Sequence, residues 1–199
     1  MAENTELREK LLYKRQNGYK TITQKDKKAM NEFAEGYKAF IDNNKTEREC
    51  IKSAIDMAKA NGFTQYKWGK PLRAGDKIYV SNRGKGAIFA VIGGDRLSDG
   101  ANIAVSHVDS PRIDIKQNPI YEDSELCYLK THYYGGIKKY QWFSIPLELR
   151  GVISLKNGKT IEIKEIGSPV FVINDLLPHL GQEQMKKPLS DAFSGESLN

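Results

Sequence analysis

The sequence has little of what small secreted proteins and membrane proteins depend on. Its 199 residues include two cysteines, Cys50 and Cys127, which are too few for a disulfide framework and match no metal-clip spacing. The longest apolar runs, such as AIFAVI, are far shorter than the ~20 residues that a membrane-spanning helix needs. The N-terminal MAENTELREK has no apolar stretch behind a basic start, which a secretory signal requires. We therefore expect a cytoplasmic protein with reduced thiols and no contact with a membrane.

A concentrated patch of one charge is also missing. The net charge is +6 at pH 7, from 31 Lys and Arg against 25 Asp and Glu. The lysine clusters at 25–28, 136–139 and 185–187 do not alternate with aromatic residues as an RNA-binding surface does. Lysines on solvated faces explain this pattern, so we do not expect nucleic acid as the main partner. A hydrophobic content of 39% is enough for a core and excludes global disorder.

Helical patterns occupy the N-terminal third. Residues 5–15 have mixed charge and predict a short helix, and apolar residues at helical spacing predict a second helix over 23–42. A third helix is predicted from Thr46, because Thr46 followed by Glu49 is a capping-box signal. Asn61-Gly62 is the expected stop signal of that helix.

The pattern then changes to the two-residue period of strands. The segment 101–107, ANIAVSH, is nearly continuous in apolar residues and predicts a central strand covered on both faces. Asn157-Gly158 lies between two alternating runs and predicts a hairpin with a tight primed turn. The other predicted strands are 76–82 and 86–94, joined by an RGKG turn, and 125–134 and 168–175. The last twenty residues are polar and predict no terminal element.

These elements predict an α/β fold in two parts. Residues 1–116 would form N-terminal helices and the first strands of an α/β layer, and residues 117–199 a β-rich unit resembling a small barrel or sandwich. The polar, turn-rich segment KQNPIYEDS, from Lys116, is the expected crossing between them. The α/β layer has too few elements to cover a sheet on both faces, so we expect it to be incomplete and more protein to follow.

His107 and Asp109 follow directly after the predicted strand 101–107. Residues two apart on a strand point to the same face, and ligand sites in open α/β sheets gather beyond the carboxyl ends of strands. A metal-binding histidine usually donates its other ring N–H to a carboxylate or carbonyl, and a His-x-Asp segment can provide both groups. Spacing alone favours the alternative, a half-exposed histidine at a strand end beside a turn aspartate.

The motifs around this pair carry a resemblance to a known family. In order and spacing, SHVDSPRIDIKQNP, YYGGIKKYQWF and LELRGVI resemble the aspartyl aminopeptidase family of dinuclear zinc exopeptidases, over roughly residues 77–180. The resemblance implies that His107 is a zinc ligand and that Asp109 orients it. It implies that residues 134–136 form the turn leading into the β-rich domain, and that His179 reaches into the active site of a neighbouring subunit. His132 matches nothing in the family pattern.

The resemblance implies a zinc-dependent aminopeptidase that removes N-terminal, possibly acidic residues from peptides by a zinc-activated water. Two zinc ions would be needed per complete site, and in the family the other ligands and the glutamate general base follow the β-rich insertion. We therefore expect this chain to be the N-terminal part of such an enzyme and inactive alone, and to join a homo-oligomer of the family's dodecamer type. The alternative is a non-enzymatic β-rich binding or assembly module with a helical arm that could contact RNA.

Overall fold

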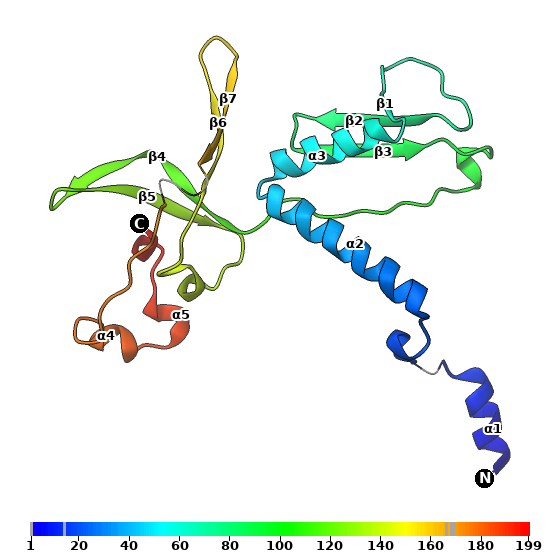
Figure 1. The fold of residues 1–199 in the computed structure, drawn as a ribbon, viewed down its shortest axis with the longest axis horizontal. Helices are drawn as coiled ribbons and strands as arrows, with labels where there is room; N and C mark the ends of the chain where they lie inside the picture. The colour runs from blue at the N-terminus through cyan, green and yellow to red at the C-terminus, as the bar shows by residue number, and fades with distance from the viewer. Residues whose placement is uncertain (1, 14, 166, 168–169) are drawn as a thin grey trace. The chain divides into compact units, whose positions relative to one another are not determined.

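The computed structural model describes residues 2–13, 15–165, 167 and 170–199 (Figure 1). Its contacts divide the chain into two compact units, residues 1–43 and 44–199. Helices and sheets both occur, which confirms the predicted mixed α/β class. None of the described helices is long and apolar enough to cross a membrane.

The first unit is helical. It contains α1 (Ala2–Leu11), a short 3-10 turn η1 (Gly18–Lys20) and α2 (Gln24–Asn43), so both predicted helices are present. A reciprocal cap fixes the start of α2, because the backbone N–H of Thr23 donates to Asp26 Oδ2 at 2.9 Å and the N–H of Asp26 donates to Thr23 Oγ1 at 3.2 Å.

The second unit begins with α3 (Glu47–Ala60), which packs against a three-stranded sheet. The predicted capping box is confirmed, and the helix ends at Asn61. The sheet has the order β1 (Thr64–Gln65), β2 (Lys77–Asn82), β3 (Gly86–Val91), with β1 parallel and β3 antiparallel to β2. The predicted turn between β2 and β3 is also confirmed.

The predicted central strand at 101–107 is wrong. Residues 101–111 have no strand assignment, and the side chains of Ile103 and Val105 are 81% and 90% exposed. An apolar run indicates that a segment favours burial, but a strand also needs a neighbouring strand with which to form hydrogen bonds. No strand in the described part of the chain pairs with this segment.

A long hairpin follows, formed by β4 (Arg112–Asp123) and β5 (Leu126–Tyr134). The turns predicted from Lys116 are wrong, because residues 116–123 belong to β4. Their polar, proline-containing sequence instead matches an irregularity in the ladder, where residues 116–119 lie opposite Lys130 alone. Proline lacks the N–H that a regular ladder needs, so it is tolerated at such a bulge. The predicted division after residue 116 falls within β4 and stays a prediction.

A second hairpin pairs β6 (Leu149–Ser154) with β7 (Thr160–Glu165), as predicted. The predicted two-residue turn is wrong. The N–H of Gly158 donates to the carbonyl of Leu155 at 2.9 Å, and the N–H of Leu155 donates to the carbonyl of Lys159 at 2.7 Å. Gly158 has φ +82°, so the connection is a three-residue loop with glycine at its left-handed position.

The C-terminal residues are packed rather than featureless, which corrects the prediction of no terminal element. They form α4 (Gln182–Met185), α5 (Leu189–Ala192) and the 3-10 turn η4 (Glu196–Leu198). Leu198 is fully buried, and Thr131 of β5 donates its hydroxyl to the Leu198 carbonyl at 2.7 Å.

The strand predicted at 168–175 is reduced to two isolated bridges. Phe171 pairs with Leu147 and Ile173 pairs with Phe143. Residues 168–169 lie outside the described residues.

Leu198→Ala tests this C-terminal packing. Removing a fully buried leucine side chain typically costs 2–5 kcal/mol, so we expect the free energy of unfolding in urea to fall by about that amount. The control is Leu189→Ala on α5, whose side chain is 59% exposed and whose loss should be under about 1 kcal/mol. Equal losses in the two variants would contradict the packing described.

Candidate active site

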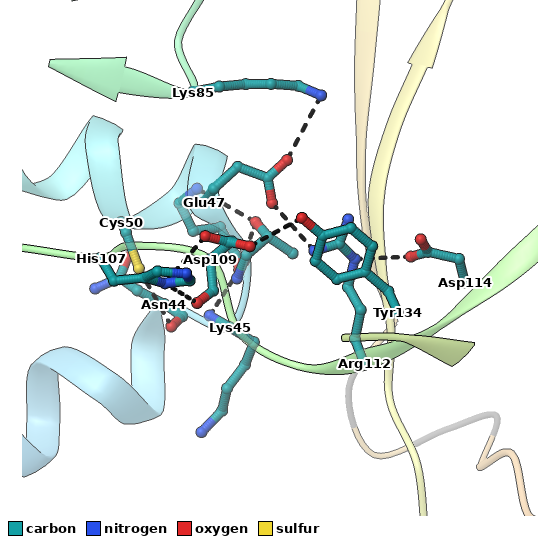
Figure 2. A network of polar contacts seen from close by, with 12 residues as sticks. Asn44, Lys45, Glu47, Cys50, Lys85, His107, Asp109, Arg112, Asp114 and Tyr134 are labelled. Carbon is teal, nitrogen blue, oxygen red and sulfur yellow. Dashed lines mark hydrogen bonds and ion pairs between the residues drawn. The ribbon is translucent and has the colours of Figure 1, made fainter. Parts of the chain in front are cut away.

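His107 and Asp109 are in direct contact (Figure 2), although the strand from which we expected them to project is absent. The His107 Nδ1 atom is 3.0 Å from Asp109 Oδ1 and 2.9 Å from the Asp109 backbone oxygen. The His107 side chain is 77% exposed, so the ring is not buried among hydrocarbon. With Nδ1 facing two oxygen acceptors, Nε2 is the ring atom left to bind a metal.

The second carboxylate oxygen of Asp109 is held from another element. The Tyr134 hydroxyl, at the end of β5, donates to Asp109 Oδ2 at 2.9 Å. This hydrogen bond lowers the pKa of Asp109 below the ordinary carboxyl value and raises the pKa of Tyr134. Sequence reasoning placed Tyr134 at the end of a predicted strand and in the turn that follows, and did not identify this contact.

Arg112 connects Tyr134 to the rest of the second unit. Its guanidinium carbon lies 4.1 Å from the centre of the Tyr134 ring, within cation–π range. Its Nε donates to Asp114 Oδ1 at 2.7 Å, and its NH1 is 3.6 Å from Glu47 at the start of α3. Lys85, in the turn between β2 and β3, also pairs with Glu47 at 3.6 Å. Figure 2 shows these contacts as one continuous network.

Glu49 links the start of α3 to β6. One carboxylate oxygen accepts the backbone N–H groups of Lys45 and Thr46, at 2.9 and 3.0 Å. The other oxygen binds Arg150 at 2.9 Å, and only 7% of the Arg150 side chain is exposed. Burial pushes the pKa of Glu49 upward, but the hydrogen bonds from Arg150 and the backbone outweigh it, so the pKa of Glu49 is lowered. Glu148 also pairs with Arg150, at 2.7 Å.

The described residues fit one corner of a metal site. His107 offers an imidazole nitrogen with an oriented carboxylate behind it, a common arrangement around zinc. No cluster of three or more His, Cys, Asp or Glu side chains that could hold a metal occurs in the described ranges. A catalytic zinc typically has three protein ligands, so further ligands are required.

The other histidines lie elsewhere. His179 is exposed in the turn at 178–180 that precedes α4, and no hydrogen bond or ion pair connects it to the network among the residues described. His132 lies on β5 opposite Asp114, the strand position that its sequence context predicts.

Known proteins share this sequence and fold. A family model described as aminopeptidase I zinc metalloprotease (M18) matches residues 40–195. The probable M18 family aminopeptidase 1 of Borrelia garinii subsp. bavariensis is 48% identical over 190 residues, which cover 93% of this chain and 41% of that protein. The crystal structure of an M18-family aminopeptidase from Thermotoga maritima matches with a TM-score of 0.83 and 38% identity, over 94% of this chain and 41% of that chain.

A more distant structure has the same fold. The mApe1 dodecamer of S. cerevisiae matches over 84% of this chain and 42% of its own, with a TM-score of 0.63 and 18% identity. The chain thus spans less than half the length of each of these relatives.

The ion pair of Glu49 generates a pH prediction. Because the folded-state pKa of Glu49 lies below the ordinary value of 4.5, its stabilisation is complete above that value. It is then lost as the pH falls through the folded-state pKa. We expect Glu49→Gln to lower the free energy of unfolding by about 1–3 kcal/mol at pH 7, because a charge-assisted hydrogen bond is lost.

The difference between Glu49→Gln and the unsubstituted chain should then shrink as the pH falls below 4.5. Urea unfolding followed by circular dichroism at several pH values measures it. Glu162→Gln, at an exposed position on β7, is the matched control and should follow the unsubstituted chain at every pH. A loss for Glu49→Gln that is equal at pH 7 and pH 3 would show that the carboxylate charge does not stabilise the fold.

Proposed function

The chain belongs to the aminopeptidase I zinc metalloprotease (M18) family, and on that premise we propose that it supplies the N-terminal part of a zinc-dependent aminopeptidase. The reaction would be the release of N-terminal residues from peptides. The observation that carries the proposal is the contact between His107 and Asp109, in which the carboxylate occupies Nδ1 and leaves Nε2 for a metal. The family match supports this function, and none of the comparisons supports a non-enzymatic binding module.

Each residue of the pair would have a separate task. His107 would bind one zinc ion through Nε2, and Asp109 would hold the ring in the required orientation and tautomer. Zinc, when bound, supplies a Lewis acid that polarises the scissile carbonyl and lowers the pKa of the attacking water. A second zinc, the remaining ligands and a glutamate general base would come from sequence outside residues 1–199.

We also propose that residues 1–116 belong to the catalytic α/β layer and that residues 117–199 form an inserted β-rich domain that mediates assembly. Two antiparallel hairpins, β4–β5 and β6–β7, support a β-rich region. The mApe1 dodecamer, which has this fold, supports a homo-oligomer. The exposure of His179 is compatible with a role in the active site of a neighbouring subunit, where it would bind substrate.

The proposed substrates are peptides with an acidic N-terminal residue. A net charge of +6 would favour the approach of acidic peptides through long-range electrostatic attraction. The two free cysteines, Cys50 and Cys127, are compatible with the reducing environment of the cytoplasm, where we place the enzyme.

A chimera tests the peptidase proposal. Residues 1–199 are joined to the remaining C-terminal part of the B. garinii relative, and zinc-dependent hydrolysis of an α-glutamyl p-nitroanilide is measured. We expect activity from the chimera and none from residues 1–199 alone. His107→Gln should lower kcat/KM by at least ~100-fold, because the loss of an outer-shell partner of a metal already costs 10–100-fold.

His132→Gln in the same chimera is the matched control and should retain activity, since His132 lies on β5 away from the network. Zinc-dependent hydrolysis by residues 1–199 alone would contradict the proposal. Full activity of an otherwise active chimera after His107→Gln would contradict the role of His107.

Mixing two inactive variants tests the role of His179. We expect the His179→Ala chimera to lose most of its activity, because the substrate of each site would lack a contact from the neighbouring subunit. Subunits carrying His107→Gln should then restore part of that activity when the two variants are assembled together. Activity that stays absent in mixed oligomers, verified by native mass spectrometry, would exclude the shared-site arrangement.

A further inference from the structure

We propose that Tyr134 is a positioning residue for the His107–Asp109 pair. Its hydroxyl holds one oxygen of the Asp109 carboxylate, so that the other oxygen faces the His107 ring. The importance of this arrangement for catalysis rests on the proposed function, whereas the arrangement itself can be tested on this chain.

The contacts of Asp109 divide cleanly between its two oxygens. Oδ2 accepts the Tyr134 hydroxyl at 2.9 Å, and Oδ1 faces His107 Nδ1 at 3.0 Å. A carboxylate turns freely about its terminal bond unless both oxygens are engaged. The Tyr134 hydrogen bond therefore sets the direction in which the Asp109 carboxylate faces His107.

The backbone around Asp109 gives the pair little other support. Among the described residues, the segment 101–110 makes no backbone–backbone hydrogen bond. The side-chain hydrogen bond from Tyr134 thus connects this segment to the ordered β4–β5 hairpin. Without it, the position of the carboxylate would depend on a part of the chain that no ladder holds.

Tyr134 is itself well placed to act as an anchor. It is directly opposite Arg112 in the β4–β5 ladder, and the Arg112 guanidinium covers its ring at 4.1 Å. Arg112 is fixed in turn by Asp114 and by Glu47 at the start of α3. The Tyr134 hydroxyl is protonated at neutral pH, as a donor must be, because a tyrosine pKa is ordinarily about 10.

A rival arrangement gives the proposal a sharp test. The backbone oxygen of Asp109 is also 2.9 Å from His107 Nδ1 and could fix the ring without the carboxylate. If the Tyr134 hydroxyl holds the Asp109 carboxylate against His107 Nδ1, removing that hydroxyl releases the carboxylate. The tautomer of His107 then changes. If the backbone oxygen is sufficient, the tautomer stays the same.

The experiment measures the tautomer of the neutral His107 ring in residues 1–199, labelled with ¹⁵N in the histidine rings. Long-range ¹H–¹⁵N spectra separate the Nδ1–H and Nε2–H forms, and His132→Gln and His179→Gln assign the three rings. We expect His107 to be mainly Nδ1–H in the unsubstituted chain. Tyr134→Phe, which keeps the ring under Arg112, should remove that majority and move His107 toward the Nε2–H form of free histidine.

Tyr133→Phe is the matched control, because the neighbouring tyrosine lies on the opposite face of β5 and its ring contacts His132 and Lys139. It should leave the His107 tautomer unchanged, and the amide spectra of both variants should match that of the unsubstituted chain. Two results would overturn the proposal. The first is a His107 ring that is mainly Nε2–H in the unsubstituted chain, a result that does not depend on the folding of any variant. The second is an unchanged His107 tautomer in Tyr134→Phe.

Failure of the peptidase proposal can be told apart from failure of this one. A tautomer change in Tyr134→Phe supports positioning even if the chimera shows no hydrolysis. If the chimera is active but the His107 tautomer is the same with and without the Tyr134 hydroxyl, the peptidase proposal stands and the positioning role of Tyr134 is wrong. In an active chimera, Tyr134→Phe should also weaken zinc binding, because Asp109, the partner of His107, loses its support, and Tyr133→Phe should not.

Discussion

Glu49 makes both a local hydrogen bond that caps α3 and a long-range ion pair with β6. One of its carboxylate oxygens closes the first turn of α3, and the other binds an arginine on β6, 101 residues further along the chain. Arg150 is nearly buried, and a buried cation without a partner is strongly unfavourable. The ion pair therefore fixes the start of α3 relative to the β6–β7 hairpin. Glu47, two residues earlier on the same helix, then lies where it can pair with Arg112.

From that fixed helix start, the contacts lead to the candidate site in a few steps. Glu47 holds Arg112, Arg112 covers the Tyr134 ring, and Tyr134 binds the Asp109 carboxylate. Most of these side chains are exposed or only partly buried, so each contact is weak alone. Their effect comes from connecting a segment without a ladder to two ordered elements. Exposure at the far end of the network leaves the His107 ring accessible to a ligand.

The parts of the fold that depend on neighbours in sequence could be predicted, and the parts that depend on distant partners could not. The capping box at Thr46 and both predicted hairpins follow from local signals, and all are present. The segment 101–107 has the composition of a buried strand, but composition does not specify the neighbour that a strand needs. Leu198 is fully buried, and Thr131 of β5 binds its carbonyl, a contact across 67 residues that no local pattern indicates.

The candidate site divides in the same way. The contact between His107 and Asp109 joins residues two apart, so it is local, although the strand on which the expectation rested is absent. The Tyr134 hydrogen bond spans 25 residues and depends on the register that places Tyr134 opposite Arg112. Residues 116–124 were predicted as a crossing rather than a strand, and the bulge in β4 made the register of Arg112 and Tyr134 impossible to count from the sequence.

The bulge also divides the β4–β5 ladder into two stretches that differ in register. Residues 116–119 take up the offset against Lys130, so the pairing at the Tyr134 end does not have to follow the pairing at the tip, where Asp123 meets Leu126. The tip can therefore change in length or composition over generations without moving the tyrosine. A single ribbon could in this way evolve new contacts at one end while the chemistry at its other end is conserved.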